Sequence, residues 1–457
     1  MERRQFLKFG AQAAAAVAAA PLNAFGSEGR TKGPSVAATD HDAVREVHRV
    51  RITPISLEIS DRQVLRTVGY DGRSPGPVLR MRSGVPTALE VFNESAYPET
   101  VHPHGQHVPM DADGTPEEGS PLVGPGESRR FVFVPGPPGT RWYHSHAHTH
   151  GDATRGLYTG QEGVLIVEGG KDPGAYDREV ILITHDWEHL IHAMKGKDAP
   201  GPMFSVNGRA LGFGDPVQVR AGERILFRIV NGNAHEEIYL ALPGHRFQVV
   251  ALDGNPVPRP HAVQTLRLGS GERVDAFVEM RNPGVWILGE PRAERRNDGL
   301  GVVVEYAGRT GKPMWEEPLR RDWDYAAFGA QETSATPDER IEMVFDRGPK
   351  SENRPWRING KPFWEQEYYK LQLGRRYRLI FRDKSDRLHP LHLHRHSFQL
   401  VNVEGKATSG ITKDTVCIEP NGHVEVDFIA DQPGLSLFHC HMQEHMDKGF
   451  MSLFETS

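Results

Sequence analysis

Residues 433–450 read PGLSLFHCHMQEHMDKGF, and two patterns in this stretch decide the fold and the chemistry. Residues 433–439 are a Pro-Gly turn followed by an apolar strand. The strand runs into His439, Cys440 and His441, and successive side chains of a strand point to opposite faces. The two imidazoles therefore face one way and the thiol faces the other. We interpret this as two neighbouring metal sites, because a thiolate with an imidazole suits a soft copper site and paired imidazoles suit another.

The Pro-Gly pattern occurs three times in the chain. It reads PGTRWYH at 138–144, PGVWILG at 283–289 and PGLSLFH at 433–439. Turn signals and alternating apolar runs at this spacing indicate Greek-key β-sandwiches. The first and third copies end in His, whereas the second ends in Gly289. We therefore expect ligands in the first and third units, with the middle unit as a spacer and wall.

Length and composition agree with an all-β chain of three consecutive sandwich domains. A chain of 457 residues with 48 Gly, 34 Pro and 38% hydrophobic residues is typical of a loop-rich β protein with several cores. We expect domains at 45–170, 178–308 and 338–457. Residues 27–44 are expected to form a flexible lead, and 308–338 a linker laid over the surface, with room for a short helix.

The N-terminal residues 1–26 carry Arg3 and Arg4, then Phe6-Leu7-Lys8 and an Ala-rich stretch. This pattern resembles a Tat export signal, and a short amphipathic N-terminus is the alternative. We predict that the Tat machinery exports the protein and that the mature protein is periplasmic or secreted. We expect no contact with a membrane once the signal has been removed. The net charge of −6 and the lack of a basic patch argue against nucleic acid as a partner.

Three further His clusters precede the C-terminal one. They are His102/His104, His144/His146 and His389/His392/His394, and His445 follows His441 closely. A single H-x-H would be an ordinary pair of surface imidazoles. Four clusters, one of which holds a Cys, favour metal binding over chance.

These motifs stand in the order HPHG at 102–105, YHSH at 143–146, HPLHLH at 389–394 and HCHMQEH at 439–445. In that order they resemble the three-domain multicopper oxidases, the laccase-like family, in its bacterial and Tat-exported form. The likeness extends over nearly the whole chain beyond the signal. It implies three cupredoxin-like domains and four copper ions: one type 1, one type 2 and two type 3.

The family pattern also implies a ligand set for each copper. His389, Cys440 and His445 correspond to the type 1 ligands, and His102 and His392 to the type 2 ligands. His104, His144 and His441 correspond to one type 3 ion, and His146, His394 and His439 to the other. The type 2 and type 3 ions would form a trinuclear cluster between the first and third domains.

Two more positions are candidates by the same resemblance. Phe450, ten residues after Cys440, falls at the axial position of the type 1 site. Phenylalanine cannot coordinate, and the loss of an axial donor should raise the potential; Met446 or Met451 would take this place if the register were shifted. Asp113 corresponds to a proton relay beside the type 2 copper, although Asp-Gly is also a turn signal.

The chain departs from the family pattern at three places, of which Pro103, where Trp is frequent, is the most easily tolerated. Met446 stands where many bacterial members have Glu, so we expect Glu444 or Asp447 to replace that carboxylate. Arg395 stands where Gly is common and could alter the wall of the cluster.

The remaining histidines and the second cysteine have plainer interpretations. We expect a hydrated loop at His148 and His150, with carriage of copper or protons as the alternative. We expect a solvated face at His185, His189 and His192, with a place beside a substrate or surface metal site as the alternative. His107 has no assigned role, and Cys417 should be a small buried residue.

The resemblance implies an oxidase that uses dioxygen and a small reducing donor. We expect phenolic or aromatic-amine donors. The alternative is a metallo-oxidase of Cu(I), Fe(II) or Mn(II) in metal homeostasis; the 11 Met form no dense cluster, which weakens the Cu(I) case only. A third possibility is a structural protein on the same scaffold that binds no copper. The complete set of candidate ligands argues against it. Three domains in one chain make us expect a monomer.

Overall fold

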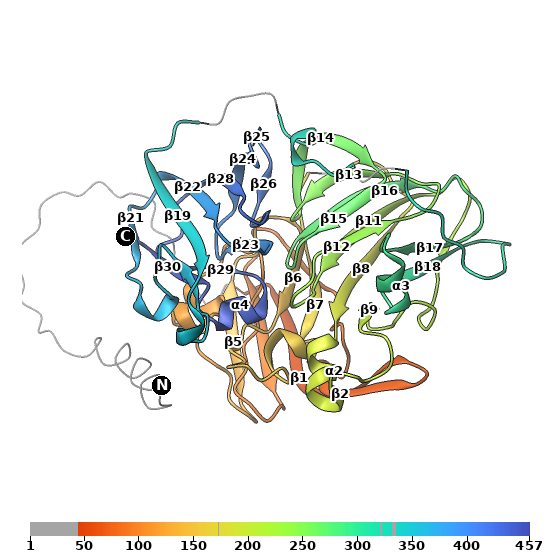
Figure 1. The fold of residues 1–457 in the computed structure, drawn as a ribbon, viewed down its shortest axis with the longest axis horizontal. Helices are drawn as coiled ribbons and strands as arrows, with labels where there is room; N and C mark the ends of the chain where they lie inside the picture. Colours follow the sequence, from red (N-terminus) through yellow and green to blue (C-terminus); the bar gives the residue numbers. More distant parts are fainter. Residues whose placement is uncertain (1–43, 172, 320–321, 331–334) are drawn as a thin grey trace, which may run out of the picture. The chain divides into compact units, whose positions relative to one another are not determined.

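The computed structural model describes residues 44–171, 173–319, 322–330 and 335–457. Almost all regular structure in these residues is β-strand (Figure 1), which confirms the all-β fold class. The predicted signal at 1–26 and most of the predicted lead lie outside the described residues. The boundaries of the three expected domains stay predictions, and we refer below to N-terminal, middle and C-terminal segments.

The N-terminal segment holds two sheets, in the orders β2-β1-β4-β5 and β3-β7-β6. Their strands are β1 (Glu46–Ser60), β2 (Gln63–Tyr70), β3 (Leu79–Arg82), β4 (Thr87–Asn93), β5 (Ser128–Phe133), β6 (Gly139–His144) and β7 (Glu162–Glu168). In β1 the alternation of sequence RVRI puts Val50 and Ile52 inside and Arg49 and Arg51 outside. Each sheet therefore buries one face against the other.

The middle segment also holds two sheets, in the orders β14-β13-β16-β11-β8-β9 and β10-β18-β17-β12-β15. Their strands are β8 (Arg178–Asp186), β9 (Phe204–Val206), β10 (Val217–Val219), β11 (Arg224–Asn231), β12 (Ile238–Ala241), β13 (Phe247–Leu252), β14 (Asn255–Val263), β15 (Thr265–Leu268), β16 (Arg273–Glu279), β17 (Val285–Gly289) and β18 (Gly301–Tyr306).

The C-terminal segment repeats this plan with the orders β20-β19-β22-β28-β24-β25, where β26 also pairs with β24, and β21-β30-β29-β23-β27. Its strands are β19 (Glu339–Arg347), β20 (Trp356–Ile358), β21 (Tyr369–Leu371), β22 (Arg376–Asp383), β23 (His389–Leu393), β24 (Phe398–Val403), β25 (Lys406–Ala407), β26 (Thr412–Lys413), β27 (Thr415–Ile418), β28 (His423–Ile429), β29 (Gly434–Cys440) and β30 (Met451–Thr456).

The three segments share one pairing scheme. The first strand of each, β1, β8 or β19, pairs in parallel with β4, β11 or β22. In the second sheets, β3, β10 and β21 pair in parallel with β7, β18 and β30. The three Pro-Gly strands β6, β17 and β29 occupy equivalent places beside β7, β18 and β30. The sequence repeat is therefore a repeat of topology as well.

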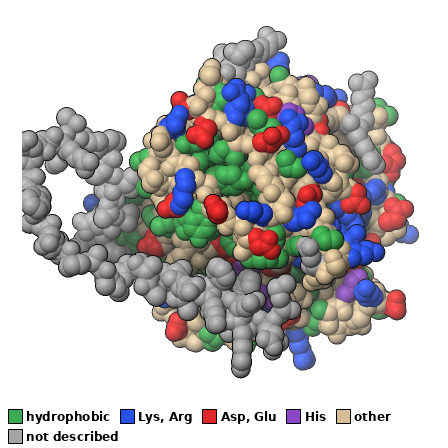
Figure 2. Space-filling model, turned by 60° about the vertical axis from the view of Figure 1, so that its left-hand side comes forward, with side chains coloured by type: hydrophobic (Ala, Val, Ile, Leu, Met, Phe, Trp, Pro, Cys, Tyr) green, Lys and Arg blue, Asp and Glu red, His purple; other side chains and the backbone are tan. Residues whose placement is uncertain are grey.

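Helices are few and short. They are α2 (Glu188–Lys195), α3 (Ala293–Asn297) and α4 (Gln443–Asp447), with 3₁₀ turns η2 (Met110–Ala112), η3 (Pro116–Glu118), η4 (Gly156–Thr159), η5 (Tyr325–Ala327), η6 (Lys350–Glu352) and η7 (Phe363–Glu365). Among the described residues, no helix combines the length and the apolar character needed to cross a bilayer. Figure 2 shows acidic and basic side chains interspersed over one face, around a group of hydrophobic side chains.

Two hydrophobic cores carry most of the packing. One joins both sheets of the N-terminal segment, and a larger one runs without interruption through the middle and C-terminal segments. The described part of the predicted linker contributes to the larger core, because Tyr325 and Phe328 are buried in it. That stretch is thus anchored by aromatic side chains, and its short helix is the 3₁₀ turn η5.

Candidate metal centre

Backbone pairing brings the four His clusters to the ends of neighbouring strands. His102 and His144 exchange two backbone hydrogen bonds of 2.8 and 3.1 Å. In the C-terminal segment β23 runs antiparallel to β29, with His392 opposite His439. The two segments meet where Glu118 Oε1 of η3 accepts the backbone N–H of Leu437 at 2.6 Å. Clusters that are far apart in sequence therefore face one another.

The thiol of Cys440 lies with two imidazoles on one side of β29. The Sγ atom is 3.6 Å from Nδ1 of His389 and 3.4 Å from Nδ1 of His445, and these two nitrogens are 3.1 Å apart. Cys440 and His389 are fully buried, and His445 is 8% exposed. His439 and His441 lie on the other side, as strand alternation requires.

The surroundings of the Cys440 site fix its imidazoles and leave one side apolar. The Ser385 hydroxyl donates to Asp383 and accepts from Nε2 of His389 at 2.9 Å, which leaves Nδ1 of His389 as a lone pair aimed at the thiol. The Phe450 ring lies 4.9 Å from the His389 ring. Met446 and Met451 instead belong to a separate apolar cluster. The side chain expected at the axial position thus lies beside the His389 ring, whereas the two alternative methionines pack into another apolar cluster.

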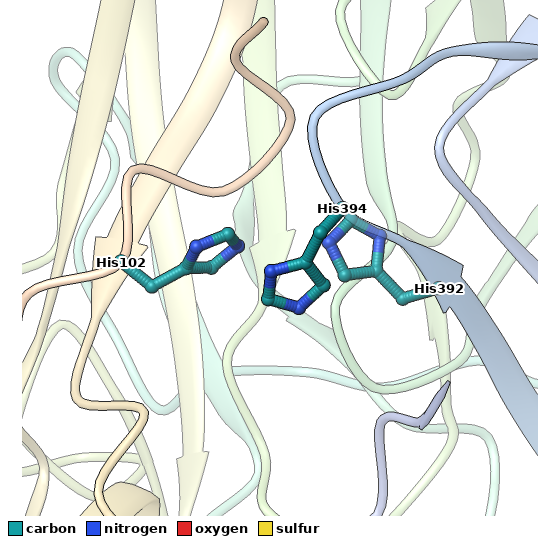
Figure 3. Close-up of side chains that lie close together, drawn as sticks. All are labelled: His102, His392 and His394. Atoms are coloured by element: carbon teal, nitrogen blue, oxygen red, sulfur yellow. The ribbon is translucent and has the colours of Figure 1, made fainter. Parts of the chain in front are cut away.

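Eight further imidazoles converge on the opposite side of β29. They are His102, His104, His144, His146, His392, His394, His439 and His441, and none is more than 3% exposed. Nε2 of His439 is 3.0 Å from Nε2 of His394 and 3.5 Å from that of His146. Nδ1 of His104 is 3.4 Å from Nε2 of His144. Figure 3 shows His102, from the N-terminal segment, reaching towards His392 and His394 at the end of β23.

The hydrogen bonds of these imidazoles leave nitrogen lone pairs free to bind a metal. His102 and His392 donate Nδ1–H to the carbonyls of Asp113 and Asp414, each at 2.7 Å. His441 places Nδ1 2.9 Å from Ser270 Oγ. In all three rings Nε2 is buried and has no hydrogen-bond partner in the described residues. One anchored N–H and one free lone pair is the arrangement of a metal-binding imidazole, so the donor set fits copper.

Burial also keeps the imidazoles neutral. It lowers the pKa of His389 to about 3 and that of His439 to about 4, and it holds the pKa of His445 well below its usual value. The same cause lowers the pKa of His104, His144, His146, His392, His394 and His441 well below the usual value. Neutral imidazole is the form that binds a metal.

Asp113 lies beside two rings of the cluster. Its Oδ2 accepts from Nδ1 of His394 at 2.8 Å and from the Thr115 hydroxyl at 2.8 Å, and it is 3.4 Å from Nδ1 of His102. Burial raises the pKa of Asp113, but the His102 ring and the hydrogen bonds outweigh burial and lower it. Oδ1 is buried with no partner in the described part of the chain. One oxygen therefore anchors a ring and the other is available to a proton.

A second buried carboxylate, Asp414, was not predicted. Its Oδ1 accepts from Nε2 of His104 at 3.0 Å, and both of its oxygens bind the Arg273 guanidinium at 2.6 Å. Arg141 adds a bond of 3.3 Å. Burial opposes the charge, but Arg273 keeps the pKa of Asp414 well below its usual range. Asp414 therefore orients His104. It immediately precedes the strand TVCI, and nothing in the local sequence distinguishes it from an ordinary residue at the start of a strand.

Three other supporting residues also escaped the sequence analysis. Ser270, whose hydroxyl contacts His441, and Arg273 both come from the middle segment. The middle segment is thus more than a spacer, because it orients the cluster without a ligand of its own. Trp356 packs its ring 4.4 Å from His445 and 4.7 Å from His389. No local sequence signal identifies these long-range partners.

Arg395 has a structural role at its unusual position. It is buried and adopts a positive φ of 61°. Its guanidinium donates to the carbonyls of Val108, Leu435 and Pro433. The side chain therefore joins the N-terminal and C-terminal segments.

Two expectations about the remaining histidines were wrong in part. The loop is exposed at His150, as expected, but the imidazole of His148 is only 21% exposed and lies between Glu117 and Asp447. Burial lowers the pKa of His148, but the two carboxylates outweigh burial and raise it to about 10. His185 is not on a solvated face either. It is 1% exposed, and its Nδ1 lies 3.2 Å from Glu162.

The other plain expectations have simple outcomes. Cys417 is buried in β27, as expected, and its thiol donates to Glu272 at 3.5 Å. Cys417 and Cys440 form no disulfide. His107 places Nε2 3.1 Å from the Ser397 hydroxyl. His192 is partly exposed and pairs with Glu188 within α2.

A cleft of about 470 Å³ reaches His445 from the surface. Its lining residues are His235, Glu236, Glu237, Arg347, Arg387, Leu388, Met442, Glu444 and His445. The cleft volume is large enough for a small aromatic molecule. His445 is the one side chain of the Cys440 site that lines it.

Comparison with protein-family models gives three matches, each described as multicopper oxidase. They cover residues 51–172, 139–298 and 333–457. Together they account for most of the chain and include every candidate ligand.

Individual proteins agree with the family models. The chain is 29% identical to the multicopper oxidase MmcO of Mycobacterium tuberculosis, over 98% of this chain and 95% of that protein. It is 25% identical to the iron transport multicopper oxidase FET3 of Gibberella zeae, over 85% and 72%. The crystal structure of a multicopper oxidase from Pseudomonas thermotolerans superposes with a TM-score of 0.72 at 25% identity, over 91% of this chain and 100% of that one.

Proposed function

Since the chain belongs to the multicopper oxidase family, we propose that it oxidises phenolic or aromatic-amine donors one electron at a time and reduces dioxygen to two waters. Four copper ions would supply the redox chemistry, one collecting electrons from the donor and three delivering them to dioxygen. A cluster suits this reaction, because reduction of dioxygen to water needs four electrons and four protons. The reading of the chain as a copperless relative is disfavoured by its complete donor set.

We assign the ligands as the family pattern implies. His389, Cys440 and His445 would hold the type 1 ion, with Phe450 as a neighbour that cannot coordinate. His102 and His392 would hold the type 2 ion. The type 3 ions would take His104, His144 and His441, and His146, His394 and His439.

The observation that supports this assignment best is the set of buried imidazole nitrogens without partners. Nε2 of His102, His392 and His441 is buried, and the other nitrogen of each ring is hydrogen-bonded. Burial of an unpaired polar atom costs about 1–3 kcal/mol. Three such atoms in one cavity favour a bound metal as the group that satisfies them.

The chain supplies a short path between the two sites. Cys440 is covalently joined to His439 and His441, and Nδ1–H of His439 also donates to the Cys440 carbonyl at 2.8 Å. A route from thiol to imidazole thus runs through a few covalent bonds and one hydrogen bond. This connection supports electron transfer from the Cys440 site to the imidazole cluster.

Asp113 would hold a proton near the cluster. Its Oδ2 is fixed by Thr115 and His394, so the partnerless Oδ1 can take and release a proton without disturbing that anchor. On the other side of the cluster, Asp447 is held by Thr149 and lies 3.5 Å from His148. We propose it, rather than Glu444, as the replacement for the carboxylate that Met446 displaces.

The donor would bind in the cleft beside His445. Outer-sphere electron transfer needs only close approach to the exposed edge of this imidazole, so the donor requires no specific anchor. A metallo-oxidase is the second candidate, because Glu236, Glu237 and Glu444 line the same cleft. The similarity to an iron transport multicopper oxidase favours Fe(II) among the metal donors.

We also propose the cell compartment and the assembly state from the sequence. The twin Arg3-Arg4 with the Ala-rich stretch supports Tat export to the periplasm or the medium. The complete donor set within one chain supports a monomer. Fractionation of cells and size-exclusion chromatography test these two points.

Copper analysis and oxygen uptake on the copper-loaded enzyme test the central proposal. We expect four copper ions per chain, an intense blue absorption band, and one dioxygen consumed for every four electrons taken from a phenol. Turnover of Fe(II) faster than that of the phenol would select the metallo-oxidase. Hydrogen peroxide as the stoichiometric product would reject the proposed reaction.

A further inference from the structure

The cleft beside His445 is lined by charged side chains of both signs. They are the carboxylates of Glu236, Glu237 and Glu444 and the guanidiniums of Arg347 and Arg387. A donor that approaches His445 comes close to these charges. Charges that already have a partner within the protein attract a donor less than free ones, so the free charges decide which donors the cleft accepts.

Each of the three carboxylates has a basic partner that does not line the cleft. The pairs are Glu236 with Arg295, Glu237 with Arg267, and Glu444 with Lys448. The first two are 2.9 Å long. Arg267 is shared with Glu419, so Glu237 keeps part of its charge. Most of the acidic charge of the cleft is therefore offset within the protein.

The Arg347 guanidinium, by contrast, pairs with no carboxylate among the described residues, and its Nε atom is buried without a hydrogen-bond partner there. Arg347 ends β19, directly opposite Trp356 of β20. Its Cζ atom lies 5.2 Å from the centre of the Trp356 ring, which holds the side chain by a cation–π contact. The same ring lies 4.4 Å from that of His445. A free positive charge therefore lies close to the imidazole where electrons would enter.

Arg387 adds a second positive charge to the lining. Its nearest carboxylate is that of Asp386, 4.0 Å away, and the two side chains are 64% and 90% exposed. An ion pair so open to water contributes little, so Arg387 stays available to a ligand. Leu388 and Met442 supply apolar surface in the same cleft. An aromatic ring that carries a negative group matches this combination of apolar and basic side chains.

We propose that Arg347 binds the carboxylate of an aromatic acid, so that phenolic acids are preferred as donors over neutral phenols and over cations. This inference rests on the function proposed above and names the substrate class of its donor cleft. The planar fork of N–H groups on a guanidinium matches the two oxygens of a carboxylate. Arg387 raises the local concentration of anions. Electron transfer itself does not require the anchor, which selects among donors.

The anchored group takes no part in the redox step. Each donor molecule gives one electron to the type 1 copper and its hydroxyl proton to water, and it leaves as a phenoxyl radical. Its carboxylate is unchanged and can still bind Arg347. The acceptor of the electron is the one that the proposed function already supplies, so no further oxidant is needed.

Initial rates of oxygen uptake by the copper-loaded enzyme, with syringate and with methyl syringate as donors, test the anchor. Loss of a positive charge near the copper changes its potential for both donors, so the ratio of their kcat/KM values isolates the carboxylate. We expect the ratio of syringate to ester to fall about tenfold in Arg347→Gln, which loses a hydrogen bond between charged groups. Arg347→Lys should lose less, because it keeps the charge without the fork.

Arg340→Gln is the matched control. Arg340 lies on the same strand, is exposed and does not line the cleft, so this variant should keep the ratio of the parent. An unchanged ratio in Arg347→Gln, or an equal fall in the control, would overturn the anchor alone. A parent that oxidises neither phenol would reject the proposed function and the anchor with it.

Benzoate separates binding from turnover, because it has no hydroxyl to oxidise. Crystals of the copper-loaded enzyme soaked in benzoate should show its carboxylate within hydrogen-bond distance of the Arg347 guanidinium, with the ring towards His445. Soaked crystals without benzoate at Arg347 would overturn the anchor even if the kinetic ratio had changed. The blue band of each variant shows that its copper centre is intact.

Discussion

The Cys440 site and the imidazole cluster lie on opposite sides of one strand, and they differ in what surrounds them. His445 lines an open cleft and the Cys440 site has one apolar side, formed by Phe450. The cluster is sealed, and charged groups such as Asp113 and Asp414 bond directly to its rings. A site that exchanges electrons needs contact with a donor, whereas a site that consumes protons needs nearby groups that carry them.

The largest expected effect comes from removing the group that joins the two sites. Cys440→Ser should abolish the blue band and the oxidation of any donor, because a hydroxyl does not replace a thiolate as a soft ligand. Visible absorption and oxygen uptake measure both. Far-UV circular dichroism should match the parent. A blue band that persists in this variant would remove Cys440 from the site.

The second effect is on the charged surroundings of the cluster. Asp414→Asn leaves the buried Arg273 and Arg141 without their shared carboxylate, so the free energy of unfolding should fall by about 3–5 kcal/mol. Urea denaturation of the metal-free protein measures it. Glu90→Gln is the control, because its pairs with Arg49 and Arg130 are at the surface and worth less than about 1 kcal/mol. Equal losses in the two variants would contradict the importance of burial.

A third change separates the two sites kinetically. Asp113→Asn should slow reoxidation of the reduced enzyme by dioxygen about 10²-fold, since the amide cannot relay protons. Reduction of the blue band by the donor should keep its rate, because the imidazoles that Asp113 contacts belong to the cluster and not to the Cys440 site. Stopped-flow absorption follows both half-reactions. Unchanged reoxidation would rule out the relay.

A fourth change makes the Cys440 site less apolar. Phe450→Met places a thioether near the site, and a weak axial ligand stabilises the oxidised ion. A tenfold gain for the oxidised ion corresponds to a potential about 59 mV lower. Redox titration of the blue band measures the shift, and Met446→Leu, in a separate cluster, should leave the potential unchanged. A potential that does not move would place Phe450 outside the axial position.

The smallest effect concerns His148, which lies between Glu117 of the N-terminal segment and Asp447 of the C-terminal segment. Its pKa is raised from 6.5 to about 10, so its contribution to stability is complete below about pH 6.5 and is lost as pH rises to about 10. His148→Gln should therefore lower Tm by roughly 1–3 °C at pH 6 and hardly at all at pH 10. Thermal unfolding of both proteins checks this. A difference that stays the same at both pH values would show that the charge of His148 contributes nothing.

The fold class and the candidate ligands could be predicted from the sequence, because both follow from the order of residues within short segments. Alternation around Cys440 separates the two sites, and the Pro-Gly turns mark β6, β17 and β29. The spacing of side chains along a strand is fixed by geometry, so a short motif is sufficient.

The supporting residues were not accessible, because they depend on contacts between distant segments. Asp414 is 310 residues from His104, and Ser270 is 171 from His441. The polar loop around His148 looked hydrated since Glu117 and Asp447 lie far from it in sequence. Burial by tertiary packing leaves no local pattern.

The opposed faces of β29 make the length of this strand a strict requirement. A single residue inserted after Leu437 would turn every following side chain to the other face, so the thiol would point at the imidazole cluster and His439 at Phe450. Deletions and insertions of two residues would keep the faces but move them by about 7 Å along the strand. We therefore expect this strand to tolerate substitutions but not insertions or deletions, in contrast to the surface loops.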